Sequence, residues 1–267
     1  MKHRLVVSDI DGTLLAPGEV LSSRTIDLIH LFQEKGGIFT IATGRMEKAV
    51  LPLVQRIGLN HPVILYNGSL IMNPQGEEVI FEAKLEADIA ARSLALSNAF
   101  DLGMLLYLEG VAYTKEMTSY IERHNQKEHV TCKVVDSFSP LLEAGLTKIL
   151  FMGDAKLVDQ LEQTHRQQQG VKFNVIRSEV NYLEVLPENA SKGNALEWLA
   201  SHLSIPLSET VAIGDERNDL SMIRQAQVGV AVNNAVKELK MEADLIVDGS
   251  YSTGVAEVLE KILAGTL

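Results

Sequence analysis

The sequence predicts an α/β fold, in which a parallel-sheet core carries an inserted α+β domain. Apolar runs alternate with helical patterns in the first third of the 267 residues, and the same alternation returns in the last third. Strands that are apolar throughout and alternate with helices are typical of a parallel sheet covered on both faces. The middle of the chain lacks this alternation. We therefore expect residues 1–81 and 188–267 to form one core and residues 82–187 to form the insertion.

The first third supplies three strands and two helices. Apolar strands are predicted at 5–7, 38–42 and 63–66. Ser22 or Ser23 can cap a first helix, because a serine hydroxyl accepts a hydrogen bond from a free backbone N–H at a helix start. Gly36-Gly37 ends that helix, and a second helix is expected to run to about residue 57.

The last third repeats the pattern. Helices are predicted at 192–203, from about 219, and at 255–263, with strands at 211–213, 228–232 and 245–247. On the last helix, apolar residues recur at the spacing of one helical face.

The middle mixes helices with hairpin-like strands. Helices are predicted at 85–99, 115–127 and 155–169, and strands at 104–108, 111–114, 147–152, 172–176 and 182–186. Glu109-Gly110 stands between two of these strands and indicates a β-hairpin.

Charge and composition exclude several classes of protein. The formal net charge of −11 would repel nucleic acid and anionic membranes, so we expect neither as a partner. No segment approaches the roughly 18 apolar residues that a membrane span needs. Cys132 is the only cysteine and permits no intrachain disulfide, which fits a reducing, cytoplasmic location. The sequence allows a monomer or a small homo-oligomer.

The most informative segment follows the first strand. Asp9 and Asp11 come directly after it, and Gly12 follows them. Two neighbouring anions repel each other unless a cation or a proton lies between them, whereas turn capping would explain only one aspartate. Gly12 lets the backbone turn sharply. The segment therefore indicates a metal-assisted site.

Three other loops also follow predicted parallel strands. They are Thr43–Arg45, Asn67–Ser69 and Gly214–Asp219, and Lys192 begins a helix near the last of them in sequence. Open α/β sheets bind ligands at the carboxyl ends of their strands. The four loops are therefore expected to form one site.

The residue types suggest phosphoryl chemistry. Asp9 can attack phosphorus to form an acyl-phosphate, and Asp11 can act first as general acid and then as general base. Oxygen ligands together with a phosphate favour Mg²⁺ over Zn²⁺, and Asp215 would be a second protein carboxylate on the metal.

Several of these residues keep a plainer alternative. Thr43 and Gly44, expected at a helix start, can hold phosphate or only cap the helix, and Lys192 can balance the anions or be a solvated helix lysine. Arg45 can contact substrate or pair with an acid. Asp219 can cap a helix or orient other groups.

These residues together resemble the haloacid dehalogenase superfamily of phosphohydrolases, in its Cof-type branch. The four motifs that carry the resemblance, in order, are Asp9-Ile10-Asp11-Gly12-Thr13, Thr43-Gly44-Arg45, Ser191-Lys192-Gly193 and Gly214-Asp215-Glu216-Arg217-Asn218-Asp219. Asn67-Gly68 also resembles a loop of the branch. One departure is Asn233-Asn234-Ala235, where relatives often have glycine in the first position.

The resemblance implies a role for each motif. Asp9 would be the nucleophile and Asp11 the acid/base, with Mg²⁺ bound by the carboxylates of Asp9 and Asp215 and by the backbone carbonyl of Asp11. Thr43, Gly44 and Lys192 would hold the phosphate, with Asn218 close to it. Arg45 is carried as a further substrate-binding candidate, and Asp219 and Asn67 as supporting residues.

The resemblance also implies a Rossmann-like, haloacid dehalogenase-like core and a cap formed by the insertion, which chooses the substrate. No motif identifies the cap residues that contact substrate, so Glu184, Arg177 and the hairpin near Glu109 are only candidates.

The predicted function is a Mg²⁺-dependent phosphatase that hydrolyses small phosphomonoesters, such as sugar phosphates, through an aspartyl-phosphate. Two alternatives stay open: a phosphomutase or phosphotransferase of the same superfamily, and a sugar-phosphate-binding regulator without turnover.

Overall fold

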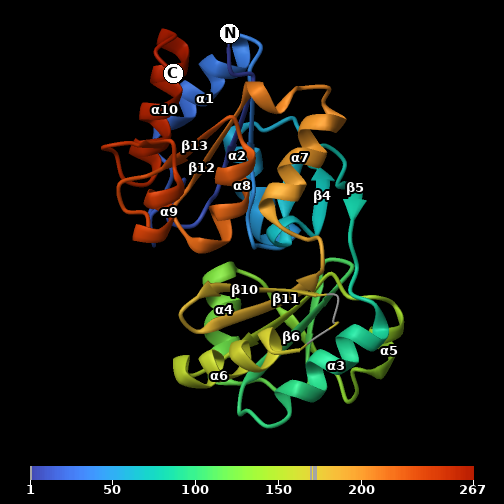
Figure 1. Cartoon of the computed structure of the whole chain (residues 1–267). Coiled ribbons are helices and arrows are strands. Elements are labelled where there is room, and N and C mark those ends of the chain that lie inside the picture. The colour runs from blue at the N-terminus through green and yellow to red at the C-terminus, as the bar shows by residue number, and fades with distance from the viewer. Residues whose placement is uncertain (1, 169, 171–172) are drawn as a thin grey trace. The chain divides into compact units, whose positions relative to one another are not determined.

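The computed structural model describes residues 2–168, 170 and 173–267 (Figure 1). The chain divides into two compact units. The first, here called the core unit, comprises residues 1–44, 51–80 and 191–267. The second, the insertion unit, comprises residues 45–50 and 81–190. The insertion unit has a six-stranded sheet, and the core unit has a five-stranded sheet with a three-stranded extension.

The sheet of the core unit is parallel and has the order β14-β13-β12-β1-β2. Its strands are β1 (Leu5–Ser8), β2 (Ile38–Ile41), β12 (Thr210–Gly214), β13 (Val228–Ala231) and β14 (Leu245–Ile246). Every residue of β1 and β12 is buried, as expected for central strands with both faces covered. A parallel bridge between Ala42 and Ile64 places β3 beside the end of β2.

Strand β3 (Val63–Leu65) leads into an antiparallel extension of the core unit. It pairs with β4 (Leu70–Asn73), and the three-stranded sheet ends with β5 (Glu78–Glu82). The sequence analysis did not predict β4 or β5. The turn between β3 and β4 is the short helical segment η1 (Tyr66–Gly68).

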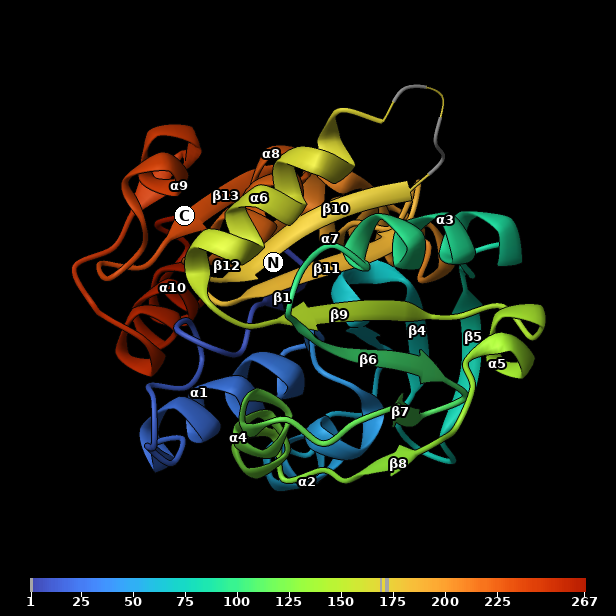
Figure 2. The same ribbon diagram turned by 90° about the horizontal axis from the view of Figure 1, so that it is seen from below.

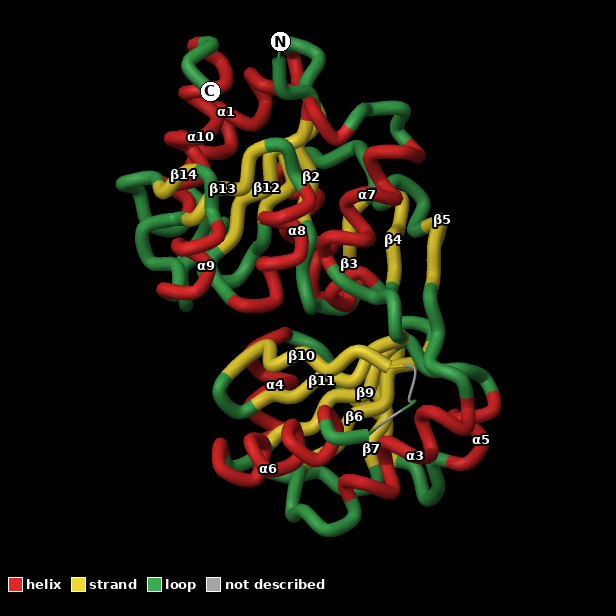
Figure 3. The backbone as a smooth tube through the Cα atoms, viewed as in Figure 1, coloured by secondary structure: helices red, strands yellow, loops and turns green. Residues whose placement is uncertain are grey.

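Serine caps begin two helices of the core unit. The helices are α1 (Ser23–Glu34), α2 (Glu47–Ile57, shared with the insertion unit), α7 (Lys192–His202), α8 (Leu220–Gln225), α9 (Lys237–Glu242) and α10 (Ser252–Ala264), with the short turns η2 (Leu207–Glu209) and η3 (Arg217–Asp219). Ser22 accepts from the backbone N–H of Thr25, and Ser191 accepts from that of Asn194. Helix α1 packs against α10 and α7 against α8 (Figure 3).

The insertion unit is α+β, with the sheet order β10-β11-β9-β6-β7-β8. Its strands are β6 (Gly103–Leu108), β7 (Val111–Thr114), β8 (Cys132–Val134), β9 (Lys148–Met152), β10 (Phe173–Glu179) and β11 (Tyr182–Pro187), and its helices are α3 (Ala87–Ser97), α4 (Ser119–Glu128), α5 (Ser139–Glu143) and α6 (Ala155–Arg166). The predicted hairpin at Glu109-Gly110 is confirmed: both residues have positive φ, 49° and 68°, between antiparallel β6 and β7.

Some predicted boundaries differ from the structure. Strand β8 and helix α5 were not predicted, because two of the three β8 residues are exposed and α5 buries no residue, so neither has an apolar face to recognise. Helix α2 runs from Glu47 to Ile57, so Thr43–Arg45 form the predicted loop between β2 and this helix, and its predicted end is confirmed. Residues 169 and 172, predicted ends of a helix and a strand, lie outside the described part of the chain.

The two faces of the insertion sheet differ in chemistry. One face carries an apolar core that includes Leu106, Ile149 and Phe151, and α6 lies across β10 and β11 (Figure 2). Alternate residues of the same strands lie on the other face, among them Tyr107 and Lys148, which are opposite each other in the sheet. Buried apolar residues such as Leu105 and Leu150 share this second face with Tyr107 and Lys148.

Buried polar contacts connect this second face of the sheet to α4. The Lys148 ammonium lies 3.2 Å from a Glu184 carboxylate oxygen, and it also lies over the ring of Tyr107. The Tyr107 hydroxyl and His124 Nε2 are hydrogen-bonded at 3.0 Å. Burial, followed by the nearby charges of Lys148 and Lys127, lowers the pKa of His124 to about 3.

His124 should therefore make stability sensitive to acid. In the unfolded chain a histidine gains its proton near pH 6.5, whereas folded His124 stays neutral to about pH 3. Stability is thus lost as the pH falls below about 6.5. Between pH 7 and pH 5, the wild type should lose about 2 kcal/mol more unfolding free energy than His124→Gln. Denaturant unfolding at both pH values measures this, and equal losses would contradict it.

Candidate active site

The predicted site residues of the core unit meet at one edge of its sheet. Strand β1 lies between β12 and β2, in a register that pairs Ser8 with Ile213 on one side and with Ile41 on the other. The residues that follow these strands are therefore neighbours. Asp9 donates its backbone N–H to the Ile213 carbonyl at 2.9 Å. The edge lies at the carboxyl ends of the strands, where open α/β sheets bind ligands.

Lys192 connects two carboxylates at this edge. It is the first residue of α7, and its side chain is completely buried. Its ammonium donates to Asp9 Oδ1 and to Asp219 Oδ1, both at 2.5 Å. Burial alone would lower the pKa of Lys192, but the carboxylates of Asp219 and Asp9 raise it above its usual value. Lys192 therefore carries its charge inside the fold.

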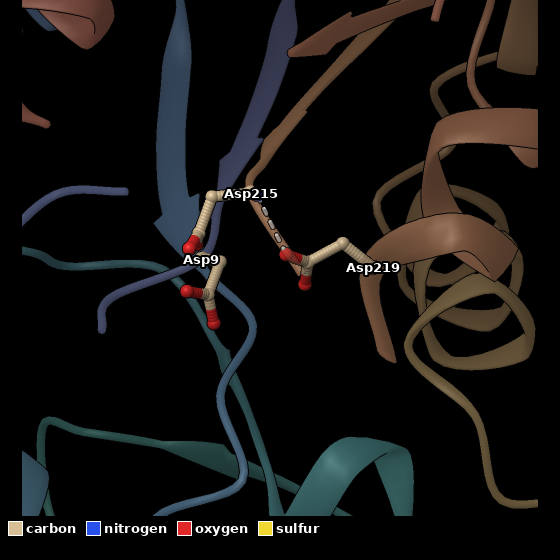
Figure 4. Close-up of side chains that lie close together, drawn as sticks. All are labelled: Asp9, Asp215 and Asp219. Atoms are coloured by element: carbon tan, nitrogen blue, oxygen red, sulfur yellow. Dashed lines mark hydrogen bonds between the residues drawn. The ribbon is translucent and has the colours of Figure 1, made fainter. Parts of the chain in front are cut away.

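Three buried carboxylates form a cluster (Figure 4). One carboxylate oxygen from each of Asp9, Asp215 and Asp219 lies within 4.8 Å of the others. Burial is the main cause that raises the pKa of Asp9 well above its usual value, against the opposing charge of Lys192. Burial and then the charge of Asp219 raise the pKa of Asp215 to about 7. One lysine does not balance this cluster, and its oxygen donors fit a hard divalent cation.

The members of the cluster are not equivalent. Asp219 accepts at Oδ1 from Lys192, and at Oδ2 from the backbone N–H groups of Asp215 and Glu216, at 2.9 and 3.1 Å. Asp215 accepts one side-chain hydrogen bond, at 2.6 Å, from the Thr13 hydroxyl. Both oxygens of Asp219 are thus used to orient Lys192 and the loop after β12. Asp9 and Asp215 fit a cation better.

Asp11 and Gly12 form a tight turn after β1. The backbone N–H of Leu14 donates to the Ile10 carbonyl at 2.9 Å, and that of Gly12 to Leu15 at the same distance. Asp11 is exposed to solvent, whereas Asp9 is 5% exposed. Gly12 has a φ of 91°, and a Cβ there would lie 2.2 Å from an Asp215 carboxylate oxygen. Only glycine fits this turn beside Asp215.

Thr43, Asn67 and Asn218 come from three loops that touch one another. Thr43 is buried, and its carbonyl accepts from the Asn67 backbone N–H at 2.8 Å. The Asn218 side-chain amide donates to Asn67 Oδ1 at 3.1 Å. The structure therefore brings the predicted supporting residue Asn67 together with two predicted phosphate-binding residues. Gly44 follows Thr43 in the same loop.

The remaining candidates belong to the insertion unit. Arg45 lies 3.4 Å from a Glu128 carboxylate oxygen, so it pairs with an acid, one of the two predicted roles. Glu184 is buried beside Lys148. Arg177 contacts Asp159 on α6 and the Glu179 carbonyl, both at 2.8 Å, which gives it a structural role between β10 and α6.

Sequence reasoning missed three side chains that support the site. Thr13 holds Asp215, and Ser221 accepts from the Gly193 backbone N–H at 3.0 Å, next to Lys192. Asn234 donates to the Gly12 carbonyl at 2.7 Å and accepts from the Tyr251 N–H at 3.0 Å. Thr13 and Asn234 lie in segments that the sequence analysis quoted. Their contacts with Asp215 and Gly12 join residues more than 200 positions apart, so no local pattern in the sequence indicates them.

Comparisons with known proteins place this geometry in a family. The family profile of haloacid dehalogenase-like hydrolases matches residues 6–259. A Yersinia pestis protein named HMP-PP phosphatase is 28% identical over 266 residues, which cover 98% of this chain and 96% of the relative.

Solved structures agree with this match. A haloacid dehalogenase-like hydrolase from Bacteroides thetaiotaomicron is 29% identical and superimposes with a TM-score of 0.86, covering 98% of this chain and 100% of the other. A sugar phosphatase described as subclass IIB of the family shares the fold, with a TM-score of 0.82 and 22% identity over 99% of this chain and 100% of the other. Among the described residues, no helix is long and apolar enough to cross a membrane.

The close approach at Gly12 can be tested with a matched pair of variants. Gly12→Ala places a methyl group against the buried Asp215, whereas Gly18→Ala, at a φ of 73°, has no atom within 4 Å of the added carbon. Both variants bear the strain of a positive φ. Gly12→Ala should lose about 2 kcal/mol more unfolding free energy than Gly18→Ala. Denaturant unfolding measures the difference, and equal losses would show that the turn yields freely.

Proposed function

Because the chain belongs to the haloacid dehalogenase-like hydrolases and is a phosphoric monoester hydrolase, we propose that it hydrolyses small phosphomonoesters through an aspartyl-phosphate at Asp9, with Mg²⁺. The observation that carries the proposal is the contact between the buried Lys192 ammonium and Asp9 Oδ1 at 2.5 Å. A buried carboxylate held by a lysine, at the ligand-binding edge of the sheet, is positioned as a nucleophile for an anionic substrate.

The two aspartates of the first motif would divide the chemistry. An Asp9 carboxylate oxygen attacks phosphorus, the bond from phosphorus to the leaving oxygen breaks, and Asp11 gives that oxygen its proton. Asp11 then takes a proton from a water molecule as the water attacks the aspartyl-phosphate, which releases phosphate and restores Asp9. The exposure of Asp11 supports this role, because a proton shuttle must reach the leaving group and water.

Mg²⁺ would be held by the carboxylates of Asp9 and Asp215 and by the Asp11 backbone carbonyl. Its chemistry is to neutralise charge on the carboxylates and on the phosphoryl oxygens. Burial raises the pKa values of Asp9 and Asp215, which means that their charged forms are costly without a cation. A bound cation would stabilise the charged forms, and this supports the assignment. Asp219 would orient Lys192 and would not bind the metal.

Thr43, Gly44, Lys192 and Asn218 would hold the phosphoryl group. A hydroxyl, backbone N–H groups, an ammonium and a side-chain amide can all donate to its oxygens. Thr43 and Lys192 are buried, which strengthens such contacts because water does not screen them. Arg45, which pairs with Glu128, stays a candidate for substrate contact.

The organic part of the substrate is proposed to be a sugar or a related metabolite, selected by the insertion unit acting as a cap. Of the candidate residues there, the buried Glu184 beside Lys148 is favoured over Arg177, whose contacts tie β10 to α6. Similarity to a protein named HMP-PP phosphatase supports a small organic phosphate. The single cysteine supports a cytoplasmic location.

Removing the nucleophile should abolish turnover. Asp9→Asn keeps the shape of the side chain but removes the attacking oxygen anion, so kcat/KM for an aryl phosphate should fall roughly 10⁴-fold or more. Phosphate release with and without Mg²⁺ measures this. The control is Asp27→Asn, which makes the same change on the exposed face of α1. If Asp9→Asn retained wild-type activity, the proposed mechanism would be wrong.

Two further variants separate the metal ligand from the orienting carboxylate. Asp215→Asn should weaken Mg²⁺ binding roughly 30-fold or more, because a charged ligand is lost. Asp219→Asn should weaken it less than about fivefold, yet lower kcat roughly tenfold, since one of the two partners of Lys192 loses its negative charge. Calorimetric titration with MgCl₂ and steady-state kinetics report the two effects. Equal losses of Mg²⁺ affinity would make Asp219 a ligand.

A further inference from the structure

The turn between β3 and β4 has an unusual backbone. Tyr66, Asn67 and Gly68 have successive positive φ values of 48°, 53° and 99°. Asparagine tolerates this left-handed region better than most residues, but a tyrosine there is rare and strained. Tyr66 is 1% exposed and Asn67 is fully buried. A strained, buried turn persists only where the surrounding structure holds it, and such turns gather at functional sites.

Three loops hold this turn in place. The Asn67 backbone N–H donates to the Thr43 carbonyl at 2.8 Å. Asn67 Oδ1 accepts from the Asn218 side-chain amide at 3.1 Å. Gly68 packs so closely on Ser191 that a Cβ would lie 2.2 Å from the Ser191 carbonyl oxygen. Ser191 precedes Lys192. The turn therefore contacts all three segments proposed to hold the phosphoryl group, which are those of Thr43, Lys192 and Asn218.

We infer that Asn67 is a positioning residue for phosphate binding. Its side chain orients the Asn218 amide, and its backbone N–H holds the Thr43 loop in place. This inference rests on the proposed roles of Thr43 and Asn218. The residue type has a physical reason. Glycine would tolerate the left-handed backbone but has no side-chain amide. Alanine has no side-chain amide either, and its Cβ disfavours the left-handed backbone. Asparagine supplies both at one buried position.

The side-chain contribution can be separated from the backbone. Asn67→Gly keeps the positive φ and removes the amide, so its Tm should fall less than that of Asn67→Ala, which also strains the backbone. Its Kd for inorganic phosphate, measured by calorimetry with saturating MgCl₂, should rise roughly tenfold, the effect of one lost buried hydrogen bond. Asn67→Ala should weaken phosphate binding by the same factor and should have the lower Tm of the two variants.

A double-mutant cycle tests whether Asn67 acts through Asn218. Asn218→Ala should also weaken phosphate binding, and adding Asn67→Gly to it should cause little further loss, because the same hydrogen bond is already absent. The control is Glu77→Gly, another residue with a φ of 55° but exposed, which should leave the Kd unchanged.

The outcomes separate the two proposals. A wild-type Kd in Asn67→Gly, or losses that multiply fully in the double variant, would overturn the positioning role, even if Asp9→Asn abolishes turnover. Conversely, hydrolysis that survives in Asp9→Asn would overturn the proposed mechanism. The Kd of Asn67→Gly for phosphate would still test the positioning role of Asn67. A wild type that does not bind phosphate would overturn the positioning role in phosphate binding, whereas phosphate release from an aryl phosphate would still test the proposed mechanism.

Discussion

The site depends on one buried ion pair network, in which the Lys192 ammonium lies between the carboxylates of Asp9 and Asp219. A buried ammonium without partners would be very costly, and so would two buried carboxylates without a cation. The network therefore constrains the end of β1, the start of α7 and the loop after β12 to meet. Residues 183 positions apart in the chain become neighbours in this way.

This network divides the work among the carboxylates. Asp219 is held at both oxygens by Lys192 and by two backbone N–H groups, so it is an orienting group. Asp215 is held at one oxygen by Thr13, and the close approach of Gly12 fixes the turn beside it. The acidic cluster is thus a set of separate positions with different hydrogen-bond partners, and the surplus negative charge explains why it fits a divalent cation.

Much of the fold followed from local patterns. The predicted α/β class and the resemblance to the haloacid dehalogenase family are confirmed by the parallel sheet and by the family match over residues 6–259. Strands β4, β5 and β8 and helix α5 were not predicted, whereas the loop Thr43–Arg45 and the helix after it were. The roles of Asp9, Asp11, Mg²⁺ and the insertion stay predictions, as does the monomer or small homo-oligomer.

The sequence by itself determined the strand–helix alternation and the loops that carry Asp9, Thr43, Lys192 and Asp215, because periodicity and turn residues act over a few positions. Only the tertiary structure decided which groups meet. It joined Lys192 to Asp219 as well as to Asp9, and it connected Asn67 with Asn218. Such contacts depend on how β1, β12 and α7 pack, and burial then sets their electrostatics, which no local pattern records.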